Sequence, residues 1–307
     1  AEEGGEKRAS KKAKAETETG LLGASLRLSK TLRNDVYGTY GGSFLPYPSL
    51  LEAAGAGVTV DVTYPATDKH VAKQRTQQRV LLLESRELYE SVTLPLVEAA
   101  PASRVAWVDN ILEGMAEADR VMARGGGGGA GEDGWVLLPD MKWDHRRAAA
   151  ALAELKKLEE GEKGAHSEEA LAAAADRAKS AKDSFYAQLI FRDKSLKSLR
   201  DIDGETAPRV AAAVAAAFHF IKAEYGIPRS SLRAFFHYHP SYWRLHVHLV
   251  GPQAFPDDSA GRAHSVEDVL EAVRAQPGWW RERALGVRSS RGDELAEALI
   301  AAGGEQQ

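Results

Sequence analysis

Alternating apolar and polar positions predict a strand early in the chain. Three valines alternate with Thr and Asp over residues 57–64, which is the two-residue period of a half-buried strand. Residues 69–98 instead repeat apolar side chains, among them Val80 and Leu83, at spacings of three to five, which favours helix with a break near Pro95. These segments together predict a small α+β unit that ends near residue 100.

The rest of the chain predicts strands with flanking helices. Helices are expected at 102–117, at 208–225 with Gly226 closing the last turn, and from Ser265, which lies three residues before Asp268. Strands are expected at 120–123, 135–138, 186–191, 232–239 and 243–251. Residues 146–182 are rich in Ala, Lys and Glu, and predict an exposed helical insertion without evident chemistry.

Composition limits the classes of protein and of site. A length of 307 residues with 44% hydrophobic and 27% charged residues is typical of a soluble globular chain, and the longest apolar run is too short for a membrane span. The absence of cysteine excludes disulfides, thiolate metal sites and thiol nucleophiles. A net charge of −4 gives no basic field for long nucleic acid, so an anionic ligand needs a local site.

Residues 1–19 are expected to be a disordered tail. They contain five acidic and five basic groups and no large apolar residue, so they cannot offset the entropy of ordering. Their lysines and arginine also match a nuclear import patch, although solvated tails of this kind are common. We therefore divide the chain into this tail, an N-terminal domain at 20–101 and a C-terminal domain at 102–307 that carries the insertion at about 146–182.

The candidate chemistry is concentrated in residues 235–250, FFHYHPSYWRLHVHLV, which contain four of the nine histidines. On one strand, Arg244, His246 and His248 would share a face, and the two imidazoles would lie about 6.6 Å apart. His237 would join them from a preceding strand. Paired histidines can hold zinc, but such sites usually add a carboxylate or cysteine ligand. The alternative is phosphoryl or nucleotidyl transfer, in which a neutral imidazole attacks phosphorus and no metal or other cofactor is needed.

The histidine segment HYHPSYWRLHVHLV resembles the histidine-triad signature, in the version carried by scavenger mRNA-decapping enzymes. The resemblance continues in NDVYGTY, VTYPATDKH, WVDNILEGMAEADRV, LLPDMKWD and SLRDI, in that order along the chain, and spans roughly residues 30–300 apart from the insertion. One departure is that Arg244 replaces the first histidine of the triad, which leaves no imidazole role at that position.

The resemblance implies a function and a set of site residues. It implies hydrolysis of the 7-methylguanosine triphosphate cap on short RNA fragments or cap dinucleotide, with release of 7-methylguanosine monophosphate through a covalent histidine intermediate. His246 would be the nucleophile, assisted by His248 and His237. Residues implied to bind substrate are Trp107, Glu117, Arg120, Asp140, Met141, Lys142, Ser241, Tyr242, Arg244, Arg262 and Asn34.

The pocket roles that the resemblance implies agree with the chemistry of a methylated guanine. Trp107 would stack on the positively charged base, with Met141 on its other face, and Glu117 would bind the base edge. If residues 102–117 form one continuous helix, Trp107 and Glu117 point about 80° apart. Asp140 and Lys142 follow an apolar strand, where they would bind the base and the phosphates.

The same resemblance implies an α+β fold: a small N-terminal dimerisation domain, domain-swapped in a homodimer, and a histidine-triad-like α+β domain with an antiparallel sheet. It also implies closure of the first domain over the bound cap, no membrane or long-RNA partner, and a cytoplasmic location, with the nucleus as a second. Two alternatives remain open at this point. One is a histidine-triad enzyme for unmethylated dinucleoside polyphosphates, and the other is a cap-binding module without turnover.

Overall fold

A computed structural model describes residues 25–33, 37–45, 58–64, 66, 71, 78–126, 133–160, 167–254 and 261–304, with the backbone only before residue 63. The chain divides into two compact units, Ala1–Gln77 and Gln78–Gln307. The predicted tail at 1–19 and Asn34 lie outside the described residues. Among the residues that the structure describes, no helix is long and apolar enough to cross a membrane.

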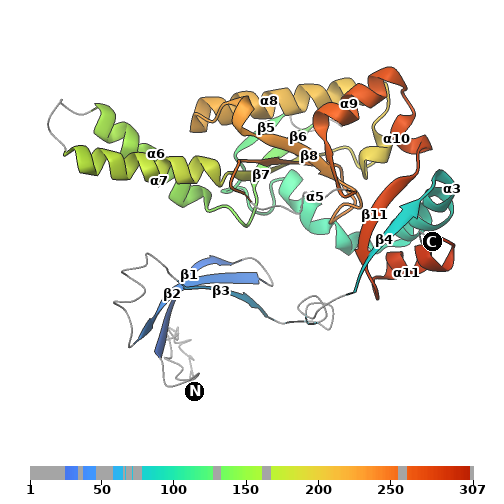
Figure 1. Ribbon diagram of the computed structural model, residues 1–307, viewed down its shortest axis with the longest axis horizontal. Helices are drawn as coiled ribbons and strands as arrows, with labels where there is room; N and C mark the ends of the chain where they lie inside the picture. Colours follow the sequence, from blue (N-terminus) through green and yellow to red (C-terminus); the bar gives the residue numbers. More distant parts are fainter. Residues whose placement is uncertain are drawn as a thin grey trace, which may run out of the picture. The chain divides into compact units, whose positions relative to one another are not determined.

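The first unit contains a three-stranded antiparallel sheet in the order β1-β2-β3, drawn in blue in Figure 1. Its strands are β1 (Ser25–Arg33), β2 (Tyr37–Leu45) and β3 (Val58–Thr63). The last of these confirms the strand predicted from alternating valines.

The second unit is built on a six-stranded antiparallel sheet in the order β10-β8-β9-β7-β6-β5. Its strands are β5 (Ala123–Gly125), β6 (Trp135–Pro139), β7 (Tyr186–Phe191), β8 (Arg233–His237), β9 (His246–Val250) and β10 (Ala263–Ser265). This mixed architecture confirms the predicted α+β class. The strands at 135–138 and 186–191 lie close to where the apolar runs placed them, whereas the strand predicted at 120–123 begins three residues later.

Helices cover both faces of this sheet (Figure 1). On one face, α8 (Ala207–Tyr225) packs with the side chains of Leu137, Leu189 and Val247. The opposite face, which carries Val136, Leu138 and Ile190, packs against α5 (Ala106–Leu112). Five further helices of the second unit are α6 (His145–Glu160), α7 (Glu168–Asp183), α9 (Val266–Ala275), α10 (Trp279–Glu282) and α11 (Glu294–Ala301).

Local signals explain where two helices begin or end. Gly226 closes α8 with a φ of +62°, a conformation that costs glycine little because it lacks a Cβ. The Ser265 hydroxyl accepts the Asp268 backbone N–H at 3.0 Å and caps α9, as predicted. The predicted insertion is helical, and α6 and α7 lie side by side with an ion pair of 2.8 Å between Arg177 and Glu154.

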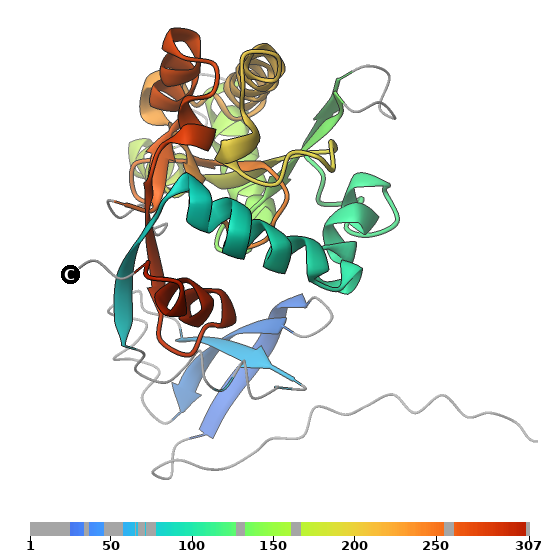
Figure 2. The same ribbon diagram turned by 90° about the vertical axis from the view of Figure 1, so that its right-hand side faces the viewer.

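The prediction of helix from residue 69 was wrong for the segment Arg79–Glu84, which is strand β4. Leu82 and Glu84 are fully buried while Leu81 and Leu83 are exposed, so the burial period is two. This strand pairs with β11 (Leu285–Ser290), far along the chain (Figure 2). A partner more than 200 residues away leaves no local signal, which is why the apolar residues looked helical.

Residues 86–99 are helical, through α3 (Arg86–Leu88), a π-helical turn at Tyr89–Thr93 and α4 (Leu94–Ala99). Pro95 lies in the first turn of α4, where a missing N–H is tolerated, so it does not cause the predicted break. Because β4 and these helices pack in the second unit, the division between compact units falls between Gln77 and Gln78, whereas the sequence placed the domain boundary near residue 101.

Candidate active site

The histidine face of β9 is the centre of the candidate site. His246 and His248 alternate with Val247 and Leu249, so they lie on the sheet face covered by α5, and both are buried. Their ring centroids are 5.0 Å apart. His237, at the end of β8, brings a third ring to 4.2 Å from His248. The structure therefore brings together the three imidazoles that the sequence predicted to be catalytic.

One nitrogen of His246 is fixed and the other is open. Nδ1 lies 2.7 Å from the Arg244 carbonyl oxygen, which can only accept, so Nδ1 carries the proton. Nε2 is buried and has no hydrogen-bond partner among the described residues. Burial lowers the pKa of His246 to about 4, against the opposing effect of the Arg244 hydrogen bond, and the His237 and Arg262 charges lower it further. At neutral pH, His246 is thus an uncharged imidazole with its lone pair on Nε2.

An aromatic shell orients the imidazoles. Tyr242 stacks on His246 with ring centroids 4.1 Å apart and an angle of 14° between the planes. The Tyr186 hydroxyl lies 3.0 Å from His248 Nδ1, and Phe235 stacks on the same ring at 5.3 Å. Burial is the main cause that lowers the pKa of His248 well below its usual value, and the electrostatic effect of His246 lowers it further. This ring is therefore also neutral.

Arg244 does not occupy the predicted place. Strand β9 begins at His246, so Arg244 precedes it instead of sharing its polar face. The guanidinium is buried and donates to Asp109 Oδ1 at 2.9 Å and to the Arg192 carbonyl at 3.3 Å. Asp109 lies on α5, so Arg244 joins this helix to the segment that enters β9.

Trp107 and Glu117 do not share a helix, because α5 ends at Leu112. Trp107 is 44% exposed on α5, and its ring meets the Tyr242 ring edge-on at 4.9 Å. Glu117 lies in a turn with a φ of +50° and pairs with Arg120, which also donates to the Pro139 carbonyl at 2.8 Å. The helical-wheel angle was therefore wrong, but the Arg120 contact places this turn at the end of β6.

Asp140, Met141 and Lys142 directly follow β6, as predicted. Asp140 Oδ1 accepts the Lys142 backbone N–H at 3.0 Å, and Met141 is 40% exposed. The Lys142 ammonium lies 5.8 Å from the centroid of the Tyr186 ring. Lys142 and Tyr186 line a cavity of about 490 Å³, and the hydroxyl of Tyr186 contacts His248. None of the three histidines lines this cavity.

Ser241 is exposed and precedes Tyr242, while Arg262 is half-buried next to β10. The charge of Arg262 lowers the pKa of both His246 and His248, so this guanidinium acts electrostatically on both imidazoles. Among the described residues, no cluster of three or more His, Cys, Asp or Glu side chains is suited to hold a metal ion.

Sequence reasoning missed Tyr186, Gln188 and Asp109. Gln188 Nε2 donates to Asp140 Oδ2 at 2.7 Å, and Gln188 Oε1 accepts from the Tyr242 hydroxyl at 2.7 Å. The available signal was one amide inside the otherwise apolar strand YAQLIF, where a polar side chain needs a partner.

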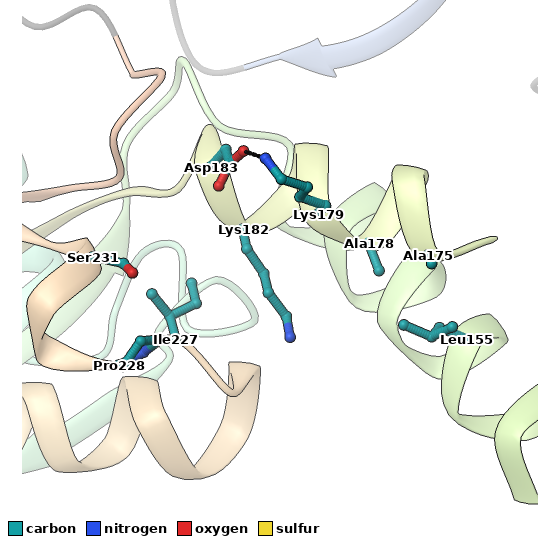
Figure 3. A pocket seen from close by; sticks show the side chains of 9 residues that line it. All are labelled: Leu155, Ala175, Ala178, Lys179, Lys182, Asp183, Ile227, Pro228 and Ser231. Atoms are coloured by element: carbon teal, nitrogen blue, oxygen red, sulfur yellow. Dashed lines mark hydrogen bonds and ion pairs between the residues drawn. The ribbon is translucent and has the colours of Figure 1, made fainter. Parts of the chain in front are cut away.

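A second cavity, of about 240 Å³, is shown in Figure 3. It is formed by the helical insertion and by Ile227, Pro228 and Ser231, which follow α8. Lys182 extends into it, while Lys179 turns to Asp183. None of the predicted site residues lines it.

Known proteins of one kind are similar to this chain. A family model described as "Scavenger mRNA decapping enzyme C-term binding" matches residues 149–264. The chain is 30% identical over 281 residues to the m7GpppX diphosphatase of Homo sapiens, which covers 91% of this chain and 70% of that protein. It is 27% identical over 276 residues to the m7GpppX diphosphatase of Ascaris suum, which covers 90% and 76%.

Proposed function

Because the chain belongs to the scavenger mRNA-decapping enzyme family, we propose that it hydrolyses the 7-methylguanosine triphosphate cap of short capped RNA fragments and cap dinucleotide. The product is 7-methylguanosine monophosphate. The observation that carries the proposal is the state of His246: a buried, uncharged imidazole whose Nδ1–H is held by a carbonyl and whose Nε2 is open. A cap-binding protein without turnover has no need of such a group.

The reaction proceeds in two displacements. The Nε2 lone pair attacks the phosphorus that carries 7-methylguanosine, an N–P bond forms, and the P–O bond to the next phosphate breaks. The RNA fragment leaves with its diphosphate. Water then attacks the same phosphorus, the N–P bond breaks, the water proton passes to solvent, and Nε2 regains its lone pair. The Arg244 carbonyl stabilises the positive charge on the imidazole between the two steps.

The phosphate oxygens are neutralised by cations that line the site. Lys142 lies beside Tyr186, and Arg262 lies close enough to the histidines to lower their pKa. His237 and His248 assist at the phosphates, and Ser241 adds a hydroxyl donor. These side chains stabilise the negative charge of the phosphates electrostatically during the reaction.

The base is recognised by an aromatic face and two carboxylates. Trp107 is exposed enough to stack on the methylated guanine, and Met141 packs on its other face. Glu117 and Asp140 accept from the base edge. The contacts of Arg120 assign it to holding Glu117 in place, and those of Arg244 assign it to holding α5.

The active species is a homodimer in the cytoplasm, and also in the nucleus. Contacts between chains are made by the N-terminal domain, which ends at Gln77 in the structure and is swapped between partners. An unpaired strand edge such as those of the β1-β2-β3 sheet can be completed by a second copy. Light scattering across a wide concentration range tests the dimer, and a constant mass of about 33 kDa, that of one chain, would contradict it.

Product analysis of methylated cap dinucleotide with the purified chain tests the activity. Released 7-methylguanosine monophosphate, with slower cleavage of the unmethylated dinucleotide in parallel, is the expected result. Equal rates on both would indicate a dinucleoside polyphosphate hydrolase instead. Tight binding with no product would indicate a cap-binding module.

A further inference from the structure

Gln188 connects two parts of the site that the sequence treated separately. It lies on β7, opposite Leu138 of β6 and His248 of β9, with its side chain on the histidine face. One end of its amide contacts Asp140 at the proposed base edge, and the other end contacts Tyr242, the ring stacked on the nucleophile. Both hydrogen bonds are 2.7 Å long.

The direction of these hydrogen bonds is fixed by chemistry. An ionised carboxylate can only accept, so the Gln188 NH₂ group must face Asp140. The amide oxygen then faces Tyr242, and the phenol must donate to it. Burial raises the pKa of Tyr242 well above its usual value, and the negative charge of the nearby Asp140 raises it further. The phenol therefore keeps its proton.

Tyr242 passes this orientation to both the nucleophile and the base. Its ring plane lies nearly parallel to that of His246, while the Trp107 ring meets its edge. A tilt of Tyr242 therefore shifts the packing surface of the imidazole and that of the stacking tryptophan together.

We propose that Gln188 is a positioning residue that couples the base-edge carboxylate of Asp140 to the alignment of His246 through Tyr242. The proposal rests on the proposed decapping function and deepens it. We call the series of contacts from Asp140 through Gln188 and Tyr242 to His246 the relay. Binding of the guanine edge to Asp140 then reinforces the relay, so a correct base both adds affinity and aligns the nucleophile.

The test uses two replacements at position 188 in the full chain. Gln188→Leu removes both hydrogen bonds at similar size, and kcat for cap dinucleotide should fall about tenfold. Gln188→Glu places a second carboxylate against Asp140 at neutral pH. When that introduced carboxyl is protonated, it can donate to Asp140 and accept from Tyr242, as the amide does. Activity of this variant should therefore recover as the pH is lowered from 8 to 5, while Gln188→Leu should show no recovery.

Two further variants separate the relay from general destabilisation. Tyr242→Phe keeps the stacked ring and removes only the hydroxyl, so its effect on kcat should not add to that of Gln188→Leu in the double variant. Gln276→Leu, exposed at the end of α9, serves as the matched control with unchanged kcat. Additive effects, or the absence of acid recovery in Gln188→Glu, would overturn the relay.

The outcome for the relay is distinguishable from that for the function. If the unaltered chain binds 7-methylguanosine monophosphate but cleaves no cap, the proposed function is wrong. The relay is then judged from affinity for that nucleotide, measured by tryptophan fluorescence. An affinity that rises on acidification only in Gln188→Glu supports it, and equal affinities of all variants at every pH contradict it.

Discussion

At the scale of a residue, the proposed nucleophile His246 should determine the pH range of the reaction. Its lowered pKa, about 4, keeps the imidazole uncharged through the whole neutral and mildly acidic range. We expect kcat/KM for cap dinucleotide to stay level from pH 7 to about 5 and to fall only toward pH 4, whereas an exposed histidine would titrate near 6.5. His246→Asn should abolish turnover at every pH and still bind 7-methylguanosine monophosphate. An acid limb centred near pH 6.5 would show that the nucleophile is not buried.

Trp107 tests whether the positive charge of the base is recognised. A cation over an aromatic face contributes about 0.5–2 kcal/mol, and only the methylated base carries that charge. Trp107→Ala should therefore weaken binding of 7-methylguanosine monophosphate more than binding of guanosine monophosphate, by a factor of about 2 to 30. Titrations of both nucleotides measure this difference. Equal losses would assign Trp107 to general stacking or packing.

The sequence could name most residues of the candidate site, but it could not predict their contacts. The resemblance named His246, Trp107 and Asp140, and the structure places them around Tyr242 or Gln188. Arg244 was misplaced because the strand period was extended to residues that precede the start of β9, where the chain bends. Gln188 was missed because its two partners come from other segments, and a contact across strands leaves no spacing in the sequence.

At the scale of an element, strand β4 is held by a buried ionic cluster. The Glu84 carboxylate accepts from Arg200 Nη2 at 2.9 Å and contacts His239 Nε2 at 3.0 Å, with further hydrogen bonds from Thr93 and Tyr238. Burial alone would raise the pKa of Glu84. The hydrogen bond and the charge of His239, together with the hydrogen bonds from Thr93 and Tyr238, instead lower this pKa to about 2. Since Tyr238 and His239 follow His237, this cluster ties β4 to the segment that enters the site.

The cluster makes a prediction about stability against acid. The Glu84 carboxyl gives up its proton more readily in the folded state than in the unfolded chain. Its contribution to the free energy of unfolding is therefore complete above pH 4.5 and is lost as the pH falls toward 2. Glu84→Gln should lower the free energy of unfolding at pH 7 by about 3–5 kcal/mol, because the buried Arg200 charge loses its partner. It should also flatten the pH dependence between 4.5 and 2. Urea unfolding at several pH values measures both effects.

Glu282→Gln is the matched control, because Glu282 pairs with Arg86 at an exposed position. It should leave the unfolding curve almost unchanged. A loss equal to that of Glu84→Gln would show that burial of the ion pair is not the cause. This cluster could not be predicted from the sequence, since β4 itself was taken for helix and its carboxylate then had no assigned neighbour.

At the scale of the whole molecule, charge and length act on substrate choice. A net charge of −4 repels a polyanion, whereas a cap dinucleotide carries one triphosphate, which Lys142, Arg262 and the histidines can hold locally. Each added nucleotide adds a phosphate, so the repulsion by the net negative charge of the chain grows with the length of the RNA. The predicted closure of the N-terminal domain over the cap would also disfavour a long RNA, because the RNA would obstruct closure.

We therefore expect kcat/KM to fall as the capped RNA lengthens from a dinucleotide to hundreds of nucleotides. A time course with one cap structure on chains of increasing length, at fixed salt, measures the released 7-methylguanosine monophosphate. Salt separates the two causes, because it screens charges beyond about 10 Å at 0.1 M. If repulsion dominates, raising the salt narrows the gap between short and long substrates, whereas a steric cause leaves the ratio unchanged. Equal rates on a dinucleotide and a long transcript would contradict the preference for short fragments, even with the histidine chemistry intact.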